Sequence, residues 1–404
     1  MRDRCRPGDR AVLAFPPGLD FISAFFGCLY AGVLPAPATY PKPRRGSSRL
    51  DGIAKDCLPQ AFLTTAATLD SMALDGQSDA VRQGPWYAVD QWDDDPSDSV
   101  SPVSSASDDV AFLQYTSGST SRARGVMVTH GNLLHNLEQI RCGFQLADND
   151  QREVTSGVFW LPAYHDMGLI GGILTPLYVG GTSYLTAPTT FLRRPLSWLE
   201  LISRTGAQIS GAPNFAYAFC TEKITAEQRS HLDLSRWQIA FCGAEPINAA
   251  ALAEFADAFS RSGFNAEAFY PSYGLAEATL MATGGEGPAR PNTLRVCSEA
   301  LTRHRVRALD AASPGGRELV SCGRPLGDQQ VAIVQSQTGQ TCDQDQIGEI
   351  WIRGRSVTKG YWNGDESTAG TFAARLPNGE GPFLKTGDLG FVYHGELFVT
   401  GRIK

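Results

Sequence analysis

A stretch of small and hydroxyl-bearing residues at 115–130, YTSGSTSRARGVMVTH, has the composition of a phosphate-binding loop. Glycine and small side chains let backbone N–H groups approach anionic oxygens, and hydroxyl groups donate hydrogen bonds to them. Arg124 adds a fixed positive charge. An ordinary surface loop is the alternative, because Ser, Thr and Gly clusters are common in loops. The candidate residues are Thr116, Ser117, Gly118, Ser119, Thr120 and Arg124.

Three more polar turns follow apolar segments that read as strands. The corner YHD at 164–166 follows FWLP, GAE at 243–245 follows WQIAFC, and YGLAEAT at 273–279 follows FNAEAFYPS. Ligands of open parallel sheets bind outside the carboxyl ends of the strands, so we expect these turns to converge on one cleft. His165 offers an imidazole there, either for chemistry or as a structural residue held by Asp166.

The segments around these turns alternate between strand and helix patterns. RAVLAF and VLPAPA read as buried strands on either side of the apolar helix GLDFISAFFGCLYAG, and GIAKDC followed by QAFLTT repeats the order. Strand, helix and strand at this spacing indicate a parallel sheet. AFLQ predicts a strand before the hydroxyl-rich stretch, and HGNLLHNLEQI predicts a helix after it. The polar, acidic stretch at 90–109 reads as a surface loop.

The pattern of charged and hydrophobic residues changes after about residue 290. The stretch at 293–318 is charged and shows no helical run, and GEIWIRG, FLKTGDLGFVY and GELFVTGR read as antiparallel strands joined by tight glycine turns. The sequence therefore predicts an α/β core over 1–318 and a small β-subdomain over 319–404.

Composition excludes several classes of protein. With 404 residues, 42% of them hydrophobic, and a net charge of −7, the chain is not expected to bind nucleic acid. The basic cluster at 41–49, PKPRRGSSR, reads as a solvated loop. No apolar window reaches the roughly 20 residues of a membrane span, and the N-terminus lacks the pattern of a signal peptide. Nine scattered cysteines read as reduced thiols, so we expect a cytoplasmic protein.

Four separated motifs, YTSGST, YGLAEAT, KTGDLG and GRIK, together resemble the adenylate-forming superfamily. GLDFISAFFGCLYAGVLPAPA, FWLPAYHDMGLIGGIL, SGAPNFAYAFC and ELVSCGRPL resemble the fatty acyl-AMP ligase family within it. The resemblance implies an α/β fold with two packed parallel-type sheets flanked by helices, plus a small antiparallel β-barrel-like subdomain. Residues 293–318 look like the insertion of that family.

The same resemblance implies a reaction. ATP and a fatty acid would form an acyl-adenylate and pyrophosphate with Mg²⁺, for transfer to an acyl carrier protein or to a polyketide synthase carrier domain. Two alternatives stay open: an acyl-CoA ligase, and a non-catalytic module that binds an adenylate. A P-loop kinase has no support, because the sequence contains no GxxxxGK[ST] motif.

Roles for individual residues also follow from the resemblance. The hydroxyl-rich loop and Arg124 would hold phosphates, Glu277 with Thr120 would hold Mg²⁺, and Asp388 with Arg402 would hold the ribose. The aromatic residues have core packing as an alternative, and Asp388 could be a turn residue without a ligand. The remaining assignments are Gly243, Ala244, Glu245, Ser272, Tyr273, Gly274, Leu275 and Ala276 for the nucleotide, and His165, Asn214, Phe215 and Tyr217 for the fatty acid.

The sequence departs from the family pattern at the loop and at its end. The usual loop continues with glycine, any residue, proline, a basic residue and glycine, whereas residues 121–125 here are SRARG. Family members continue beyond GRIK with a mobile C-terminal domain that carries a lysine used in adenylation. We therefore expect this chain to be the large N-terminal domain, with weak activity by itself.

Overall fold

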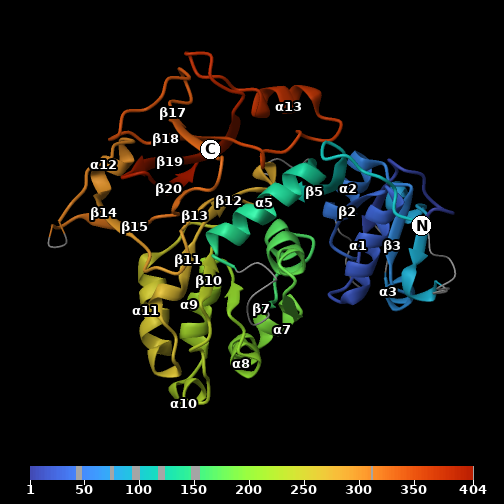
Figure 1. Cartoon of the computed structure of the whole chain (residues 1–404), viewed down its shortest axis with the longest axis horizontal. Coiled ribbons are helices and arrows are strands. Elements are labelled where there is room, and N and C mark those ends of the chain that lie inside the picture. Colours follow the sequence, from blue (N-terminus) through green and yellow to red (C-terminus); the bar gives the residue numbers. More distant parts are fainter. Residues whose placement is uncertain are drawn as a thin grey trace. The chain divides into compact units, whose positions relative to one another are not determined.

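The chain is described from a computed structural model over residues 1–41, 48–72, 77–92, 101–116, 123–146, 155–310 and 313–403. It divides into two compact units. The first unit comprises Met1–Leu134, Pro162–Leu169 and Thr358–Thr368, and the second comprises His135–Leu161, Ile170–Val357 and Ala369–Lys404. Figure 1 shows the elements of each unit, which are described separately below.

The first unit is built on a four-stranded parallel sheet with the strand order β2-β1-β3-β4. A two-stranded antiparallel ribbon, β5 and β6, accompanies it. The elements are β1 (Arg10–Leu13), α1 (Leu19–Ala31), β2 (Leu34–Pro37), α2 (Ser48–Cys57), β3 (Ala61–Thr64), α3 (Ala66–Ser71), α4 (Asp79–Arg82), β4 (Trp86–Ala88), η1 (Val89–Gln91), β5 (Val110–Thr116) and β6 (Arg124–Thr129).

Helix α1 illustrates how the sequence determines these elements. Its buried residues Phe21, Ala24, Phe25 and Cys28 recur every three or four positions, which places them on one face of the helix. The helix ends at Gly32, whose left-handed φ of 70° a residue without a Cβ adopts at little cost. The chain then enters β2 parallel to β1, as the strand–helix–strand pattern predicts.

The second unit contains a five-stranded parallel sheet, β11-β10-β9-β7-β8, and a four-stranded antiparallel sheet, β17-β18-β19-β20. Its strands are β7 (Ser156–Phe159), β8 (Thr182–Leu185), β9 (Ile209–Gly211), β10 (Ile239–Cys242), β11 (Phe269–Pro271), β12 (Tyr273–Gly274), β13 (Met281–Gly284), β14 (Thr293–Cys297), β15 (Gly316–Val320), β16 (Arg324–Pro325), β17 (Gln330–Val334), β18 (Gly348–Arg353), β19 (Leu384–Tyr393) and β20 (Glu396–Arg402).

Helices complete the second unit, and three of them, α5, η2 and α13, continue into it from the first. Their bounds are α5 (His130–Gly143), η2 (Met167–Leu174), α6 (Thr175–Tyr178), α7 (Pro188–Arg193), α8 (Leu196–Thr205), α9 (Asn214–Lys223), α10 (Ala226–Arg229), α11 (Ala249–Phe259), η3 (Ser260–Ser262), η4 (Ala266–Ala268), η5 (Ala276–Ala278), α12 (Ser298–Thr302) and α13 (Asp365–Phe372). Buried aromatic residues such as Trp198, Tyr217, Trp237 and Phe255 form the core between α8, α9, α11 and the parallel sheet.

The α/β class and the parallel sheets predicted from the sequence are confirmed, and so are the antiparallel strands near the C-terminus. Strand β6, in which Val126 and Val128 are buried, precedes the helix expected after the hydroxyl-rich stretch. The expectation of no helical run in 293–318 was wrong, because α12 lies there. This helix has no fully buried residue and hence no apolar stripe to reveal it. The proposed boundary at residue 318 falls inside the second unit and remains a prediction.

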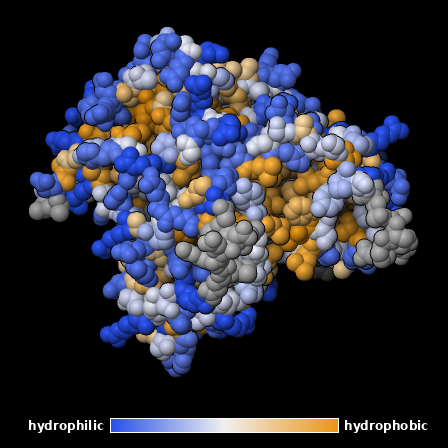
Figure 2. Space-filling model, in the orientation of Figure 1, coloured by the Kyte–Doolittle hydropathy of each residue, from blue (hydrophilic) through white to orange (hydrophobic). Residues whose placement is uncertain are grey.

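Polar and charged residues cover most of the surface shown in Figure 2, and hydrophobic residues reach it in patches. Among the described residues, no helix combines the length and the hydropathy needed to cross a membrane.

Candidate functional site

Three residues that the sequence singled out lie together in the second unit. The Tyr273 hydroxyl donates a hydrogen bond to Asp388 Oδ2 at 2.8 Å, and Arg402 Nε lies 3.0 Å from Asp388 Oδ1. Burial raises the pKa of Asp388 above its ordinary value, while the hydrogen bond from Tyr273 and the charge of Arg402 oppose that rise. We call Tyr273, Asp388 and Arg402 the tyrosine–aspartate–arginine cluster.

Backbone pairing positions this cluster. Asp388 on β19 is the ladder partner of Arg402 on β20, which places the two side chains next to each other. Tyr273 begins the β12–β13 hairpin and is 8% exposed, packed in the core of the antiparallel sheet with Ile350 and Leu397. The cluster is therefore held by a rigid sheet and hairpin, although Arg402 itself is mostly exposed.

The carboxyl ends of β9, β10 and β11 carry the other nucleotide and substrate candidates of this unit. Their strands are neighbours in one parallel sheet, so these ends meet at one edge. The Ser272 N–H donates to the Cys242 carbonyl at 2.9 Å, which joins the last two ends. The Phe215 N–H donates to Glu245 Oε1 at 2.6 Å, which joins the first two.

The residues predicted to contact the fatty acid have three different environments. Asn214 Oδ1 accepts a hydrogen bond from the Asn248 N–H at 3.1 Å, next to the start of α11. Phe215 is 43% exposed, whereas Tyr217 is fully buried and donates from its hydroxyl to the Phe241 carbonyl at 2.8 Å. Tyr217 contributes to the aromatic core, and the role of all three in acyl binding remains a prediction.

Glu277, the predicted magnesium ligand, lies half-buried on η5 between β12 and β13. Buried polar contacts fix the end of this turn: the Thr279 hydroxyl donates to the Ser356 carbonyl at 2.7 Å, and Asn136 bonds both the N–H and the carbonyl of Met281. Nothing in the sequence pattern predicted this anchoring by α5, because Asn136 reads as an ordinary helix residue.

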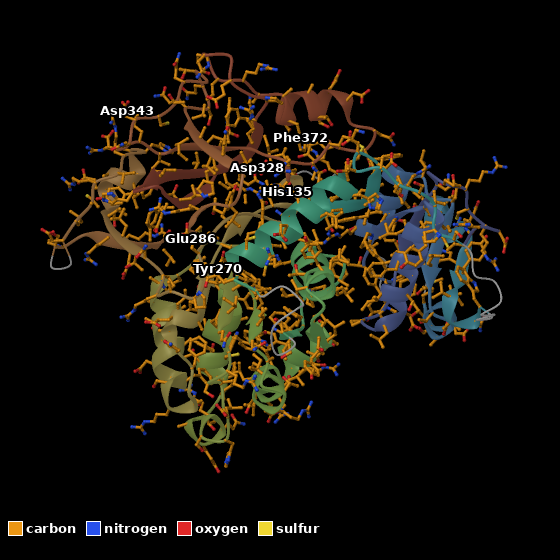
Figure 3. All side chains as sticks on the ribbon, viewed as in Figure 1. His135, Tyr270, Glu286, Asp328, Asp343 and Phe372 are labelled. Carbon is orange, nitrogen blue, oxygen red and sulfur yellow. The ribbon has the colours of Figure 1, made fainter. Side chains whose placement is uncertain are left out.

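Helix α5 makes further polar contacts with the 326–328 segment of the same unit. Figure 3 shows His135 beside Asp328, and the His135 Nε2 to Asp328 Oδ1 distance is 2.6 Å. Gln139 Nε2 donates to the Leu326 carbonyl at 2.8 Å. These bonds hold α5 against β16 and the turn that follows it.

The described residues contain no group of three or more His, Cys, Asp or Glu side chains that could bind a metal ion by themselves. Mg²⁺ is commonly bound through one or two carboxylates with phosphate oxygens and water as the other ligands, so its binding by Glu277 stays a prediction. A single carboxylate at Glu277 has the chemistry required for this mode of binding.

In the first unit, the structure describes only the ends of the hydroxyl-rich loop. Thr116 closes β5 and is the ladder partner of Arg124, which opens β6. The Arg124 guanidinium lies 5.3 Å from the centre of the Tyr361 ring. Ser117, Gly118, Ser119 and Thr120 lie outside the described residues, so their role in binding phosphate stays a prediction.

His165 belongs to the first unit, in the corner that precedes η2. Its N–H donates to the Pro162 carbonyl at 3.0 Å, and its carbonyl accepts from Leu169 at 2.8 Å. Burial, followed by the charge of Arg49, lowers the pKa of His165 to about 4. The imidazole is therefore neutral at neutral pH. The carboxylate of Asp166 accepts from the Met167 N–H at 2.7 Å, which begins the helix. Because this corner and the 243–277 turns belong to different units, the expected convergence of all three turns remains a prediction.

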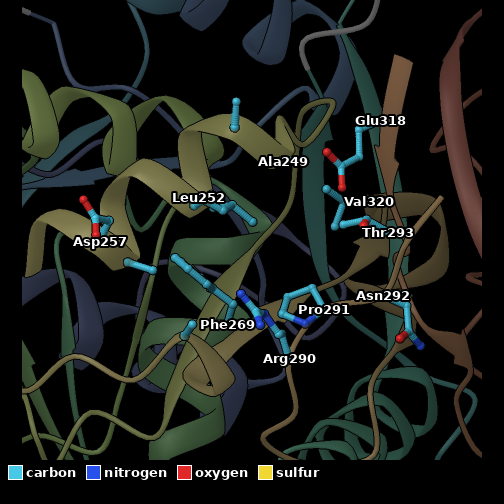
Figure 4. A pocket seen from close by; sticks show the side chains of 14 residues that line it. Ala249, Leu252, Asp257, Phe269, Arg290, Pro291, Asn292, Thr293, Glu318 and Val320 are labelled. Atoms are coloured by element: carbon cyan, nitrogen blue, oxygen red, sulfur yellow. The ribbon is translucent and has the colours of Figure 1, made fainter. Parts of the chain in front are cut away.

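A cavity of about 690 Å³ lies elsewhere in the second unit, beside α11 (Figure 4). Its walls come from α11, from residues 290–293 and from Glu318 and Val320 on β15. None of the residues assigned to the candidate site lines it.

Comparison with known proteins gives one consistent result. The family model described as AMP-binding enzyme matches residues 2–362. The chain is 41% identical to the medium-chain-fatty-acid–[acyl-carrier-protein] ligase JamA of Moorena producens, over 98% of this chain and 67% of that protein. It is 38% identical to the long-chain-fatty-acid–AMP ligase FadD26 of Mycobacterium marinum, over 98% of this chain and 69% of the relative.

Solved structures agree with the sequence comparison. A fatty acyl-adenylate ligase from L. pneumophila, solved in complex with acyl adenylate and pyrophosphate, is similar to all of this chain with a TM-score of 0.93 and 44% identity. The match covers 69% of that protein, so this chain spans about two thirds of the length of these relatives.

Proposed function

Because this chain belongs to the family of AMP-binding enzymes and its relatives are fatty acyl-AMP ligases, we propose that it activates a fatty acid with ATP. The products are an acyl-adenylate and pyrophosphate. The observation that carries the proposal is the tyrosine–aspartate–arginine cluster, since a buried aromatic ring beside a carboxylate and a guanidinium offers groups for the adenine, the ribose and its hydroxyls.

The residues proposed for this reaction have different tasks. The fatty acid carboxylate attacks the α-phosphorus of ATP, and pyrophosphate leaves. Both reactants are anions, so positive charges and N–H donors are needed near the transferred group. Arg124 and the loop that starts at Thr116 are suited to the leaving phosphates. Asp388, fixed by Tyr273 and Arg402, orients the nucleotide through its ribose.

Magnesium would be held by Glu277, with Thr120 as a second contact. It would supply positive charge to the phosphate groups. The neutral imidazole of His165 can border the acyl carboxylate without adding charge. The fatty acid chain would contact Phe215, which is exposed, more readily than the fully buried Tyr217.

The acceptor is an acyl carrier protein in our proposal, because JamA is named as an acyl-carrier-protein ligase. A carrier domain of a polyketide synthase is the other acceptor implied by the sequence resemblance. The cytoplasmic location expected from the sequence stays a prediction. Acyl transfer to free CoA would make the protein an acyl-CoA ligase.

An acceptor assay tests this function. The protein is incubated with ATP and a series of fatty acids, first as this chain and then extended to the length of its relatives. Pyrophosphate release is measured, followed by thioester formation with a phosphopantetheinylated carrier protein or with CoA. We expect pyrophosphate release that depends on the fatty acid. We also expect a thioester to form on the carrier protein and not on CoA. A thioester that forms only on CoA would show that the protein is an acyl-CoA ligase. If the extended protein binds an adenylate tightly but releases no pyrophosphate, it is a non-catalytic binding module.

A further inference from the structure

Arg49, near the start of α2, touches two segments of the first unit that the proposed chemistry uses. Its Nη2 donates to the Tyr115 carbonyl at 3.0 Å, at the end of β5 and one residue before the hydroxyl-rich loop. Its guanidinium carbon lies 5.7 Å from the centre of the Tyr164 ring, next to His165. The reading of the basic cluster 41–49 as a solvated loop therefore does not hold for Arg49, which is half-buried on a helix.

The charge of Arg49 is not neutralised within the described residues, which give it no carboxylate partner. The stretches 42–47 and 117–122, which lie outside the described residues, contain no Asp or Glu in their sequences. Burial lowers the pKa of Arg49, and the same charge helps to keep His165 unprotonated. The corner therefore carries a positive charge that a bound anion would stabilise.

A second arginine of the same unit shows the difference between a structural guanidinium and Arg49. Arg10 donates to three carbonyls, those of Cys57 at 2.9 Å, Leu58 at 3.0 Å and Gly8 at 3.2 Å, and lies over Trp362. Arg49 makes one hydrogen bond among the described residues, although a guanidinium has five N–H donors. Among the described residues, Arg49 thus uses one donor where Arg10 uses three.

Gln114 supplies an independent observation at the same corner. Its side chain is 1% exposed, and Nε2 donates to the Tyr164 carbonyl at 3.0 Å, which ties β5 to the corner. The other atom of that amide, Oε1, is buried without a hydrogen-bond partner among the described residues. Native proteins rarely leave such an acceptor unpaired. The guanidinium of Arg49 and the unpaired Oε1 of Gln114 therefore lie at the same corner, beside Tyr164.

Resting on the proposed function, we propose that Arg49 binds an anionic oxygen of the reactants, namely the carboxylate of the fatty acid or a phosphate of the nucleotide. In either case its charge offsets the repulsion between the attacking carboxylate and ATP. Gln114 would hold the corner at 164–166 against the end of β5 and accept a hydrogen bond from a water that is itself bound to the ligand.

Two substitutions and one control test this inference. Arg49→Met removes the charge and keeps an apolar stem over Tyr164, Arg49→Lys keeps the charge, and Arg10→Met removes the structural guanidinium. Calorimetry measures the affinity of each variant for decanoate, decanol, AMP and adenosine, and thermal unfolding checks that each variant is folded.

We expect Arg49→Met to weaken binding of one anion by about 10- to 100-fold and to leave its neutral counterpart unchanged. A loss with decanoate but not decanol assigns the carboxylate, and a loss with AMP but not adenosine assigns the phosphate. Arg49→Lys keeps the positive charge and should therefore recover part of the affinity for the anion. If Arg49 acted only through its hydrogen bond to the Tyr115 carbonyl, the charge alone would recover nothing. Arg10→Met should lower the melting temperature and leave the affinities unchanged.

Unchanged anion binding by folded Arg49→Met overturns this inference and leaves the proposed function standing if the wild-type protein forms acyl-AMP. Equal losses for charged and neutral ligands also overturn it, because they indicate a structural role. A wild-type protein that forms no acyl-AMP removes the proposed function and this inference together.

Discussion

Replacing Asp388 by Asn is expected to weaken binding of an acyl-adenylate by roughly 100-fold. The carboxylate is 16% exposed in its side chain, accepts from Tyr273 and pairs with Arg402, so its oxygens are already oriented. We expect it to accept from both ribose hydroxyls. Hydrogen bonds to a charged group contribute about 1.5–3 kcal/mol each, and the amide retains one weaker acceptor. Calorimetry with a stable acyl-adenylate analogue gives the affinity.

The chain offers matched controls for this substitution. Asp345 pairs with Arg305 at 2.7 Å in the same unit, but both side chains are more than half exposed. Asp345→Asn should therefore leave the affinity unchanged, as exposed ion pairs contribute little. Tyr273→Phe removes only the hydroxyl that orients Asp388 and should cause a smaller loss. An Asp388→Asn variant that folds normally and binds like the wild type would exclude Asp388 from the nucleotide site.

Replacing Gly274 by Ala is expected to lower the free energy of unfolding by 3 kcal/mol or more, on the order of the largest single-residue effects. A Cβ at this position would lie 1.7 Å from the Leu280 carbonyl oxygen and 2.9 Å from the Met281 Cα. Both are backbone atoms: Leu280 directly precedes β13 and Met281 begins it. Because β13 pairs with β12, the hairpin would have to open. That opening would also displace Tyr273 and Glu277, and ligand affinity should fall with stability.

Gly370 is the control for this second substitution. It lies on α13, and a Cβ there would meet no atom within 4 Å. Gly370→Ala should therefore stabilise slightly, by up to about 1 kcal/mol, through helix propensity. Chemical denaturation of the two variants gives both values. Equal stability of Gly274→Ala and the wild type would show that the β12–β13 hairpin tolerates a side chain and does not hold the site rigidly.

The sequence predicted the parallel sheets because hydrophobic residues recur at regular spacings along their strands and helices. Phe21, Ala24, Phe25 and Cys28 on α1 are one example. Helices without an apolar stripe, such as α12 and α13, gave no such signal. The spacing of hydrophobic residues could not predict which side chains meet. Contacts between distant segments depend on the pairing register of the strands, and the sequence of one strand does not give that register.

The candidate site illustrates the same limit. Asp388 and Arg402 came from motif resemblance, and their ladder pairing and the hydrogen bond from Tyr273 became visible only in the fold. Arg49 stood in a basic cluster that resembled a solvated loop, and its contact with Tyr115 spans 66 residues of sequence. Composition alone does not distinguish a solvated cation from a half-buried one.

Direct detection of the product tests the central claim, that this protein forms acyl-adenylates. The protein, extended to the length of its relatives, is incubated with ATP and a fatty acid panel, and the mixture is analysed by mass spectrometry. Our account predicts acyl-AMP and pyrophosphate in equal amounts, and their loss in the Asp388→Asn variant. ADP with phosphate, or no product from any fatty acid, would contradict it.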